Sequence, residues 1–237
     1  MKYTSINWKM QALLAAVFAA ISAGSAVAAP VTLAGLVAGG TVTSGDKVFF
    51  EFHNVTQVGD INVPLDEIFV DPILGGPGAV EVEYGIRFSS ALWSLTGPGL
   101  SYDIGIDFHV RQSARQALIT DNTLEFTGGV FNGGTIRIAE GVIDHATRVT
   151  LANKFVFADS TGAKLEDHQV FPGGPYVELE ISKDFAMTTG QDQQSRAFVS
   201  HFDQTFSQKQ VPEGGVGATA ALALAGLVGF ATINRKR

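Results

Sequence analysis

The chain has 237 residues, no cysteine and a formal net charge of -7 at pH 7. The absence of cysteine excludes disulfides, iron–sulfur clusters, cysteine-ligated zinc and thiol nucleophiles. The acidic balance argues against nucleic acid as a partner, because nucleic-acid binders present a basic surface. The length is ordinary for one all-β domain.

The first 29 residues have the pattern of a secretory signal peptide. Lys2 and Lys9 precede an apolar stretch at 12–21, and small residues follow at the cleavage position, namely Ala26, Ala28 and Ala29. We expect signal peptidase to cut after Ala28 or Ala29. A retained membrane anchor is the weaker alternative, because the apolar run is shorter than the roughly 20 residues that a span requires.

Residues 30–210 are expected to form one exported domain built from β-strands. Apolar and polar residues alternate at 80–88, 102–110, 149–157 and 177–181, which predicts strands with one buried and one solvated face. In 149–157 the larger residues share one parity, so we expect Phe155 and Phe157 on the buried face. Shorter strands are predicted at 47–53, 68–70, 92–95, 117–126, 135–138, 165–170 and 198–206.

Turn residues rich in glycine and proline separate these segments. Strands at this spacing predict a single antiparallel β-sandwich or jelly-roll-like domain, with most phenylalanines in its core. No helical pattern of useful length occurs in the body. The only helices that we expect are the N-terminal signal segment and a C-terminal membrane segment.

A search for catalytic groups finds no convincing constellation. Glu81 and Glu83, and likewise Glu178 and Glu180, are two residues apart on a strand and therefore roughly 7 Å apart. That spacing suits a glycosidase, but any acidic alternating strand produces it. We therefore predict no catalytic residue, no cofactor and no enzymatic activity.

The candidates for metal binding are scattered. The five histidines show no close spacing, although His109 and Asp107 could form a site with a neighbouring strand. Zinc sites need at least three oriented protein ligands, so no metal site is predicted. The loop at 159–162, with Glu166 and Asp167, is rich in oxygen ligands, but it lacks the spacing of a calcium loop and is better explained by an Asx turn.

Trp93 is the candidate residue for stacking against a sugar. It stands beside a Gly-Pro-Gly turn, where an exposed indole could contact a glycan. A core position is the favoured alternative, because residues 91 and 95 are apolar.

The last 27 residues form three consecutive pieces. The motif Val211, Pro212, Glu213, Gly214, Gly215 precedes an uncharged apolar stretch at 216–233, and the segment 234–237, with basic residues at 235–237, closes the chain. The stretch is long enough to approach the thickness of a bilayer core. The basic end predicts a cytoplasmic C-terminus. A plain anchor that is never cut remains the alternative.

This order of motif, span and basic end resembles the PEP-CTERM family of sorting signals. Val211, Pro212 and Glu213 match the family motif, whereas Gly214 replaces its usual second proline. The resemblance implies sorting by an exosortase-like processing enzyme in a Gram-negative bacterium, through an inner-membrane intermediate. It also implies exopolysaccharide as a partner.

Removal of both ends changes the charge of the working domain. Five of the 16 basic residues and one of the 23 acidic residues lie in the ends, which leaves 11 and 22, a net charge of -11. We expect an exported cell-surface or extracellular-matrix protein. The alternative is a carbohydrate- or ligand-binding module at the same location.

Overall fold

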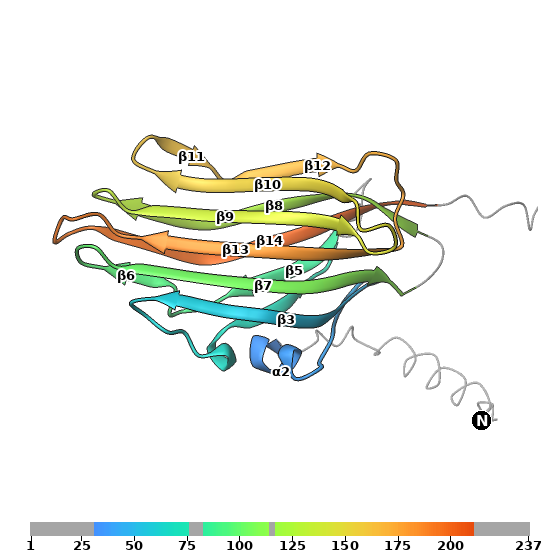
Figure 1. Ribbon diagram of the computed structural model, residues 1–237, viewed down its shortest axis with the longest axis horizontal. Coiled ribbons are helices and arrows are strands. Elements are labelled where there is room, and N and C mark those ends of the chain that lie inside the picture. The colour runs from blue at the N-terminus through green and yellow to red at the C-terminus, as the bar shows by residue number, and fades with distance from the viewer. Residues whose placement is uncertain (1–30, 76–82, 114–116, 211–237) are drawn as a thin grey trace, which may run out of the picture.

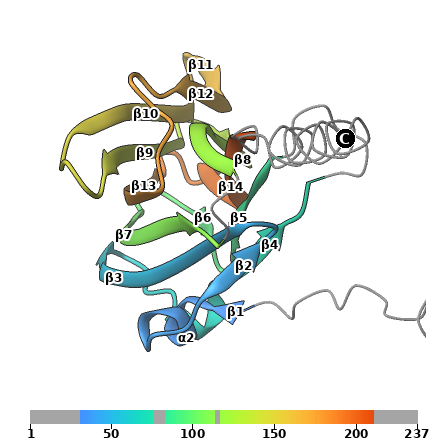
Figure 2. The ribbon, with the colours of Figure 1, turned by 90° about the vertical axis from the view of Figure 1, so that its right-hand side faces the viewer.

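The computed structural model describes residues 31–75, 83–113 and 117–210, and these residues form two packed antiparallel β-sheets (Figures 1 and 2). This confirms the predicted β-sandwich. The predicted signal and C-terminal membrane helices lie outside the described residues. Within the described part of the chain, no helix has the length and apolar character to cross a membrane.

Sheet A lies at the back in Figure 1 and contains seven strands. Its order is β1-β4-β5-β14-β8-β12, and β6 also pairs with β14. The strands are β1 (Val31–Thr32), β4 (Phe69–Ile73), β5 (Tyr84–Ser89), β6 (Ser94–Thr96), β8 (Ala117–Phe131), β12 (Glu166–Val170) and β14 (Arg196–Gln210).

Sheet B faces the viewer in Figure 1 and also has seven strands, in the order β11-β10-β9-β13-β7-β3-β2. They are β2 (Val42–Ser44), β3 (Lys47–Gly59), β7 (Ser101–Gln112), β9 (Thr135–Asp144), β10 (Thr150–Asp159), β11 (Gly162–Lys164) and β13 (Glu178–Thr188). Because the sheet is antiparallel, each strand can bury one face on the core and leave the other in water.

The alternation at 102–110 gives the expected strand, β7. Tyr102, Ile104, Ile106, Phe108 and Val110 are all buried. β7 pairs with β13 along its whole length, from Ser101 opposite Thr188 to Arg111 opposite Glu178. The period of two therefore predicted both the strand and its buried face.

Aromatic side chains join the two sheets in the core. Phe202 of β14 stacks on Phe88, with ring centroids 4.8 Å apart, and on Trp93 at 5.4 Å. Trp93 also meets Phe185 of β13 edge to face at 5.0 Å. Such pairs stabilise a fold by about 0.5–1.5 kcal/mol each beyond the area that they bury.

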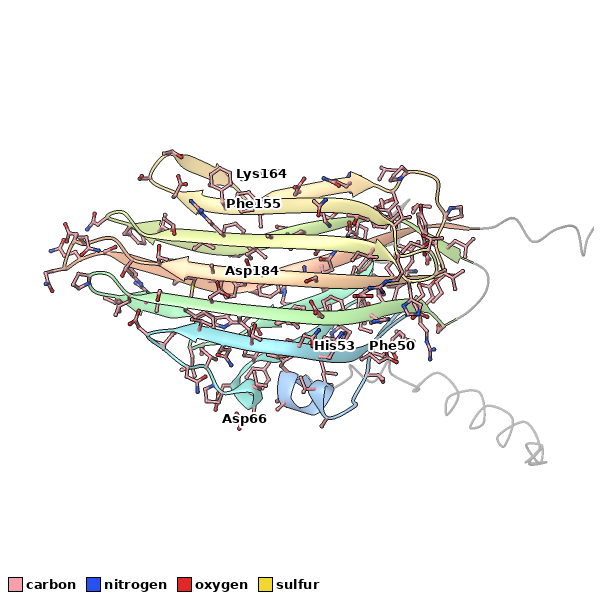
Figure 3. All side chains as sticks on the ribbon, in the orientation of Figure 1. Phe50, His53, Asp66, Phe155, Lys164 and Asp184 are labelled. Carbon is pink, nitrogen blue, oxygen red and sulfur yellow. The ribbon has the colours of Figure 1, made fainter. Side chains whose placement is uncertain are left out.

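The predicted buried face of β10 is wrong. Phe155 is 42% exposed and stacks on Phe157 on the outer face of sheet B, where Figure 3 labels Phe155. The inward positions carry Ala152, Lys154, Val156 and Ala158. A buried lysine is tolerated here because it forms an ion pair with Glu140, so hydrophobicity alone points to the wrong parity.

The prediction of a body without helices is also wrong. A short helix, α2 (Leu33–Val37), packs near β3, and a 3-10 turn, η1 (Leu65–Glu67), lies beside it. The hydroxyl of Thr32 accepts a hydrogen bond from the Gly35 amide and caps α2. Five residues are too few to display a helical period, which explains why the sequence pattern missed this helix.

Candidate ligand-binding site

A hollow of about 430 Å³ opens on the outer face of sheet A. It lies where β14 exchanges one neighbour, β5, for another, β6. The lining residues come from β4, β5, β6, β14 and the turn between β5 and β6: Phe69, Ser89, Ser90, Ala91, Trp93, Ser94, Arg196, Phe198, Val199 and Ser200.

The hollow has a local cause in the backbone. After Ser89 the chain turns inward, and the Leu92 amide donates to the Ser90 hydroxyl at 3.2 Å. The carbonyl of Trp93 then accepts from the Val199 amide, which brings the chain back to β14 as β6. On the other side of β14 the register with β8 shifts between Val199 and His201. A bulge of this kind bends a strand and changes the direction of its side chains.

Aromatic rings provide the apolar part of this surface. Phe198 is partly exposed, and its ring lies parallel to that of Phe131, with centroids 6.4 Å apart. The Arg196 guanidinium lies over the Phe198 ring at 4.9 Å. Phe69, at the start of β4, is 36% exposed and also lines the hollow. Exposed rings of this kind can pack against the C–H face of a ligand.

Hydroxyl groups provide the polar part. Ser89, Ser94 and Ser200 lie among the lining residues, and the Ser200 hydroxyl is 3.1 Å from Nδ1 of His201. Each hydroxyl can donate one hydrogen bond and accept others. A mainly apolar hollow with a few polar groups is the usual form of a small-ligand site.

Trp93, the residue predicted from sequence as a candidate for stacking, forms part of the core beneath this hollow. Only 1% of it is exposed, and Phe202 and Phe185 pack against its ring. The indole therefore has no free face for a sugar. The aromatic residues with exposed surface at the site are Phe69 and Phe198. Sequence alone could not single out Phe198, because it has the same parity as the buried Phe202 and Phe206, and the register shift between Val199 and His201 separates it from them.

Glu178 and Glu180, one of the two carboxylate pairs considered from the sequence, have different partners in the structure. Glu180 is paired with Arg148, and these interactions lower the pKa of the carboxyl group. Glu178 instead faces His109 and His145. Glu83 lines a small acidic hollow on sheet A with Glu125, and Glu81 lies outside the described residues.

The oxygen-rich loop after β10 is an Asx turn. The Asp159 carboxylate accepts from the Thr161 amide and hydroxyl, at 2.7 Å and 2.6 Å. These hydrogen bonds lower the pKa of Asp159. Asp167 is 2.8 Å from Lys164 and also accepts from the Phe155 amide. The protein's own donors therefore occupy these two carboxylates.

Two histidines and a glutamate meet on the outer face of sheet B, although no metal site was predicted. Nδ1 of His109 in β7 lies 3.2 Å from Oε1 of Glu178 in β13. Nε2 of His145, which follows β9, lies 3.6 Å from the same oxygen. The residues are distant in sequence, so only the strand order could have indicated the group. Two imidazoles and a carboxylate are a suitable ligand set for zinc.

The residues assigned to processing cannot be placed. Ala26, Ala28 and Ala29 of the signal cleavage region and the motif at 211–215 lie outside the described residues.

Comparison with known proteins identifies no family for the chain. No family model and no curated protein matches. Among solved structures, TmCBM61 in complex with β-1,4-galactotriose has 18% identity and a TM-score of 0.27, covering 65% of this chain and 89% of that one. The enzymatically active domain of bacteriophage CBA120 tailspike protein 4 has 12% identity and a TM-score of 0.24, covering 70% and 20%.

A third structure belongs to a study of carbohydrate-binding modules from the β-sandwich superfamily. Its identity is 10% and its TM-score 0.25, with 70% of this chain and 58% of that chain covered. Similarity at this level does not extend to a ligand.

Proposed function

We propose that the chain is an exported β-sandwich module that binds a carbohydrate at the cell surface, in the hollow of sheet A. The exposed ring of Phe198 carries the proposal, because it lies in the hollow with Arg196 on one face and serine hydroxyls beside it. A sugar has apolar C–H faces and hydroxyl edges. An aromatic ring and hydroxyl groups match these two properties.

The volume and chemistry of the hollow support a small segment of a glycan. About 430 Å³ lies in the usual range for small-ligand sites. Arg196 also offers fixed N–H donors to ring oxygens or to an acidic sugar. The binding proposal includes no bond-breaking step, since the lining side chains supply no pair of carboxylates.

Binding is tested with the purified full chain on a glycan array that includes neutral and acidic polysaccharides. We expect Phe198→Ala to weaken binding of any captured glycan by about tenfold or more, the size of effect typical of a central aromatic anchor. Phe155→Ala is the matched control, because Phe155 is an exposed phenylalanine on the opposite sheet. Capture of no glycan by the wild type, or equal loss in both variants, would contradict the proposal.

Export and sorting form the second part of the proposal and rest on the two ends of the sequence. The signal pattern at 1–29 and the PEP-CTERM-like motif, span and basic end at 211–237 support it. Signal peptidase and an exosortase-like enzyme are the proposed processing partners. The proposed path passes through the inner membrane to the cell surface or matrix.

Intact mass of the surface form tests this second part. We expect a chain that begins near residue 29 or 30 and ends near residue 212. Deletion of 211–237 should release the domain from the surface. A protein that keeps both ends, or that stays in the cytosol, would exclude this route.

A further inference from the structure

A charged group is buried between the two sheets, and it is independent of the hollow. Glu140 in β9 stands between Lys154 in β10 and Lys183 in β13, each lysine being its direct cross-strand partner. All three side chains are completely enclosed. With one carboxylate for two ammonium groups, the core carries an excess positive charge, which is costly in a medium of low polarity.

Sheet A supplies two amides that face this charged row. Nδ2 of Asn122 in β8 donates to Oε1 of Glu140 at 2.7 Å, and Nζ of Lys183 donates to Oε1 of Gln204 in β14 at 2.5 Å. Lys183 also donates to Oε2 of Glu140. Lys183 is therefore well satisfied, by one carboxylate oxygen and one amide oxygen.

Lys154 and Asn122 are not satisfied in this way. Nζ of Lys154 lies 2.9 Å from Oε1 of Glu140, the oxygen that Asn122 also uses. Lys154 therefore shares one carboxylate oxygen with Asn122, and its ion pair does not have the geometry of a regular hydrogen bond. Among the described residues, Oδ1 of Asn122 has no hydrogen-bond partner. Unpartnered buried polar atoms are rare and costly. The shared oxygen brings together two side chains from opposite sheets, neither of which is fully satisfied.

We propose that Lys154 and Asn122 condense to an isopeptide bond that joins β10 of sheet B to β8 of sheet A, with Glu140 as the proton carrier. Nζ of Lys154 attacks Cγ of Asn122, the new C–N bond forms, the Cγ–Nδ2 bond breaks and ammonia leaves. Glu140 accepts one proton from the lysine ammonium, and Nζ loses a second as the new bond forms. Both protons pass to the departing nitrogen, so the ammonia leaves as ammonium and removes the charge of Lys154. The step is neither an oxidation nor a reduction, and it needs no cofactor.

The surroundings favour this reaction in three ways. Burial lowers the pKa of Lys154 to about 8, so that a useful fraction of the amine is neutral and nucleophilic near pH 7. Glu140 contacts both reacting groups and can therefore move the proton without solvent. Because Lys154 and Asn122 are held close together by their two strands, the reaction needs no bimolecular encounter, which lowers the entropic part of the barrier.

The bond would also remove the electrostatic problem that the structure presents. Conversion of the Lys154 ammonium to an amide leaves Glu140 and Lys183 as a single balanced pair. β8 and β10 lie against each other although they belong to different sheets. An exported domain without cysteine would thereby gain a covalent link between its two sheets.

Intact mass of the folded full chain is the primary test, because loss of ammonia lowers the mass by about 17 Da. Protease digestion followed by tandem mass spectrometry should give a branched peptide that contains residues 122 and 154. A folded wild-type protein with the full mass of its sequence would overturn the proposal. Any processing at the termini changes the mass by much larger amounts and is scored separately.

Two matched substitutions identify the lysine. Lys154→Met should restore the full mass, whereas Lys183→Met removes the other buried lysine and should leave the link intact. Asn122→Ala and Glu140→Gln should both restore the full mass, and Asn153→Ala, at an exposed asparagine beside Lys154, should not. Retention of the link in Lys154→Met would contradict the assignment. A circular dichroism spectrum like that of the wild type shows that a variant is folded, and only folded variants are compared.

The geometry points independently to a zinc-binding site at His109, His145 and Glu178. Tetrahedral zinc holds its nitrogen and oxygen donors about 2.0–2.2 Å away, which places donors roughly 3.3 Å from one another. The two nitrogens lie 3.2 Å and 3.6 Å from Oε1 of Glu178, and all three donor atoms fall within 4.8 Å. His145 is half exposed, so small rotations of its ring can close the site.

Glu51 supports His109 from the other side. Its Oε2 lies 3.9 Å from Nε2 of His109, and its backbone has a φ of 52°, an unusual value for a residue other than glycine. The strained residue lies in a bulge of β3, near the labelled Phe50 and His53 in Figure 3. The distance between Oε2 and Nε2 is longer than a hydrogen bond, but a rotation of the exposed Glu51 side chain would let it accept from this nitrogen and orient the ring toward a metal. Asp107, Glu180 and Arg148 are further charged groups near His109.

Titration of the full chain with zinc chloride tests this second proposal by calorimetry. We expect one zinc per chain with micromolar or tighter affinity, weakened at least tenfold by His145→Ala or Glu178→Gln. His168→Ala is the matched control, since His168 is a half-exposed histidine that lies 3.3 Å from a single carboxylate, that of Asp121. No binding by the wild type, or equal binding by His145→Ala, would exclude the site.

Discussion

In β10, ion pairing rather than hydrophobicity determines which side chain points into the core of the sandwich. Lys154 takes an inward position in β10 and Phe155 the outward one, since the ion pair with Glu140 compensates part of the cost of a buried ammonium. Burial alone would raise the pKa of Glu140, but the charges of Lys183 and Lys154 outweigh it and the pKa falls below its usual value. No pattern within one strand reveals such a pair, because its members come from neighbouring strands.

The titration of Lys154 gives a prediction for the unlinked chain. In Asn122→Ala the amine stays free, with a pKa of about 8 in the fold and about 10.4 when unfolded. Between these values the unfolded chain binds more protons, so stability rises with pH, by at most about 3 kcal/mol. Burial lowers this pKa most, the carboxylates of Glu140 and Asp167 raise it, and the charge of Lys183 lowers it further.

Urea unfolding from pH 7.5 to 9.5 measures this effect. The linked wild type should show a smaller rise, because its Lys154 nitrogen is an amide, whereas Lys183 and Lys47, whose pKa values burial also lowers, contribute equally in both chains. The window ends below pH 10, since burial raises the pKa of Tyr102 to about 12 and its ionisation in the unfolded chain reverses the trend above pH 10. If the two chains show identical pH profiles, then Lys154 has the same chemical state in both, which would contradict a link that only the wild type carries.

At the scale of strands, two glycines differ in the space around them: Gly85 packs closely against a neighbouring backbone, whereas Gly141 faces open space. A Cβ at Gly85 in β5 would lie 2.0 Å from the carbonyl oxygen of Gln204 in β14, which is backbone and cannot move aside cheaply. A Cβ at Gly141 in β9 would meet only Oδ1 of Asn153, at 3.9 Å. Both glycines are in paired strands, but only Gly85 is required by its neighbour.

Substitution by alanine tests this difference. Gly85→Ala should destabilise the domain by about 3 kcal/mol or more, because β5 must move away from β14. Gly141→Ala should stay within about 1 kcal/mol of the wild type, or stabilise it, since glycine is a poor strand residue. Chemical denaturation of both variants gives the comparison, and equal losses would contradict the assigned packing.

The sequence predicts the positions of the strands better than it predicts the residues of the candidate site. The segment at 102–110 appears as β7 because its alternation is uninterrupted, and the shorter predicted strand at 198–206 lies within β14. The hollow depends instead on β14 exchanging β5 for β6, and on a turn that sends Trp93 inward. Pairing between distant strands is not encoded in any local period, so neither Phe198 nor the His109 cluster could be singled out from one sequence.

For the whole molecule, the central question is what holds two sheets together without disulfides. Aromatic contacts such as Phe202 with Trp93 stabilise the interface by packing, and packing contributes only to the folded state. A bond between residues 122 and 154 would act on the unfolded state as well. It would close a loop of about 30 residues, worth roughly 3–4 kcal/mol in the chain-entropy view.

The denaturant slope separates these two contributions. Loss of a packing contact lowers the unfolding midpoint and leaves the slope m unchanged, whereas a covalent loop keeps the unfolded chain compact and lowers m. We therefore expect a smaller m for the wild type than for Asn122→Ala, together with a higher midpoint. Asn153→Ala should follow the wild type in both quantities. An unchanged m in Asn122→Ala would mean that the sheets are held by packing alone.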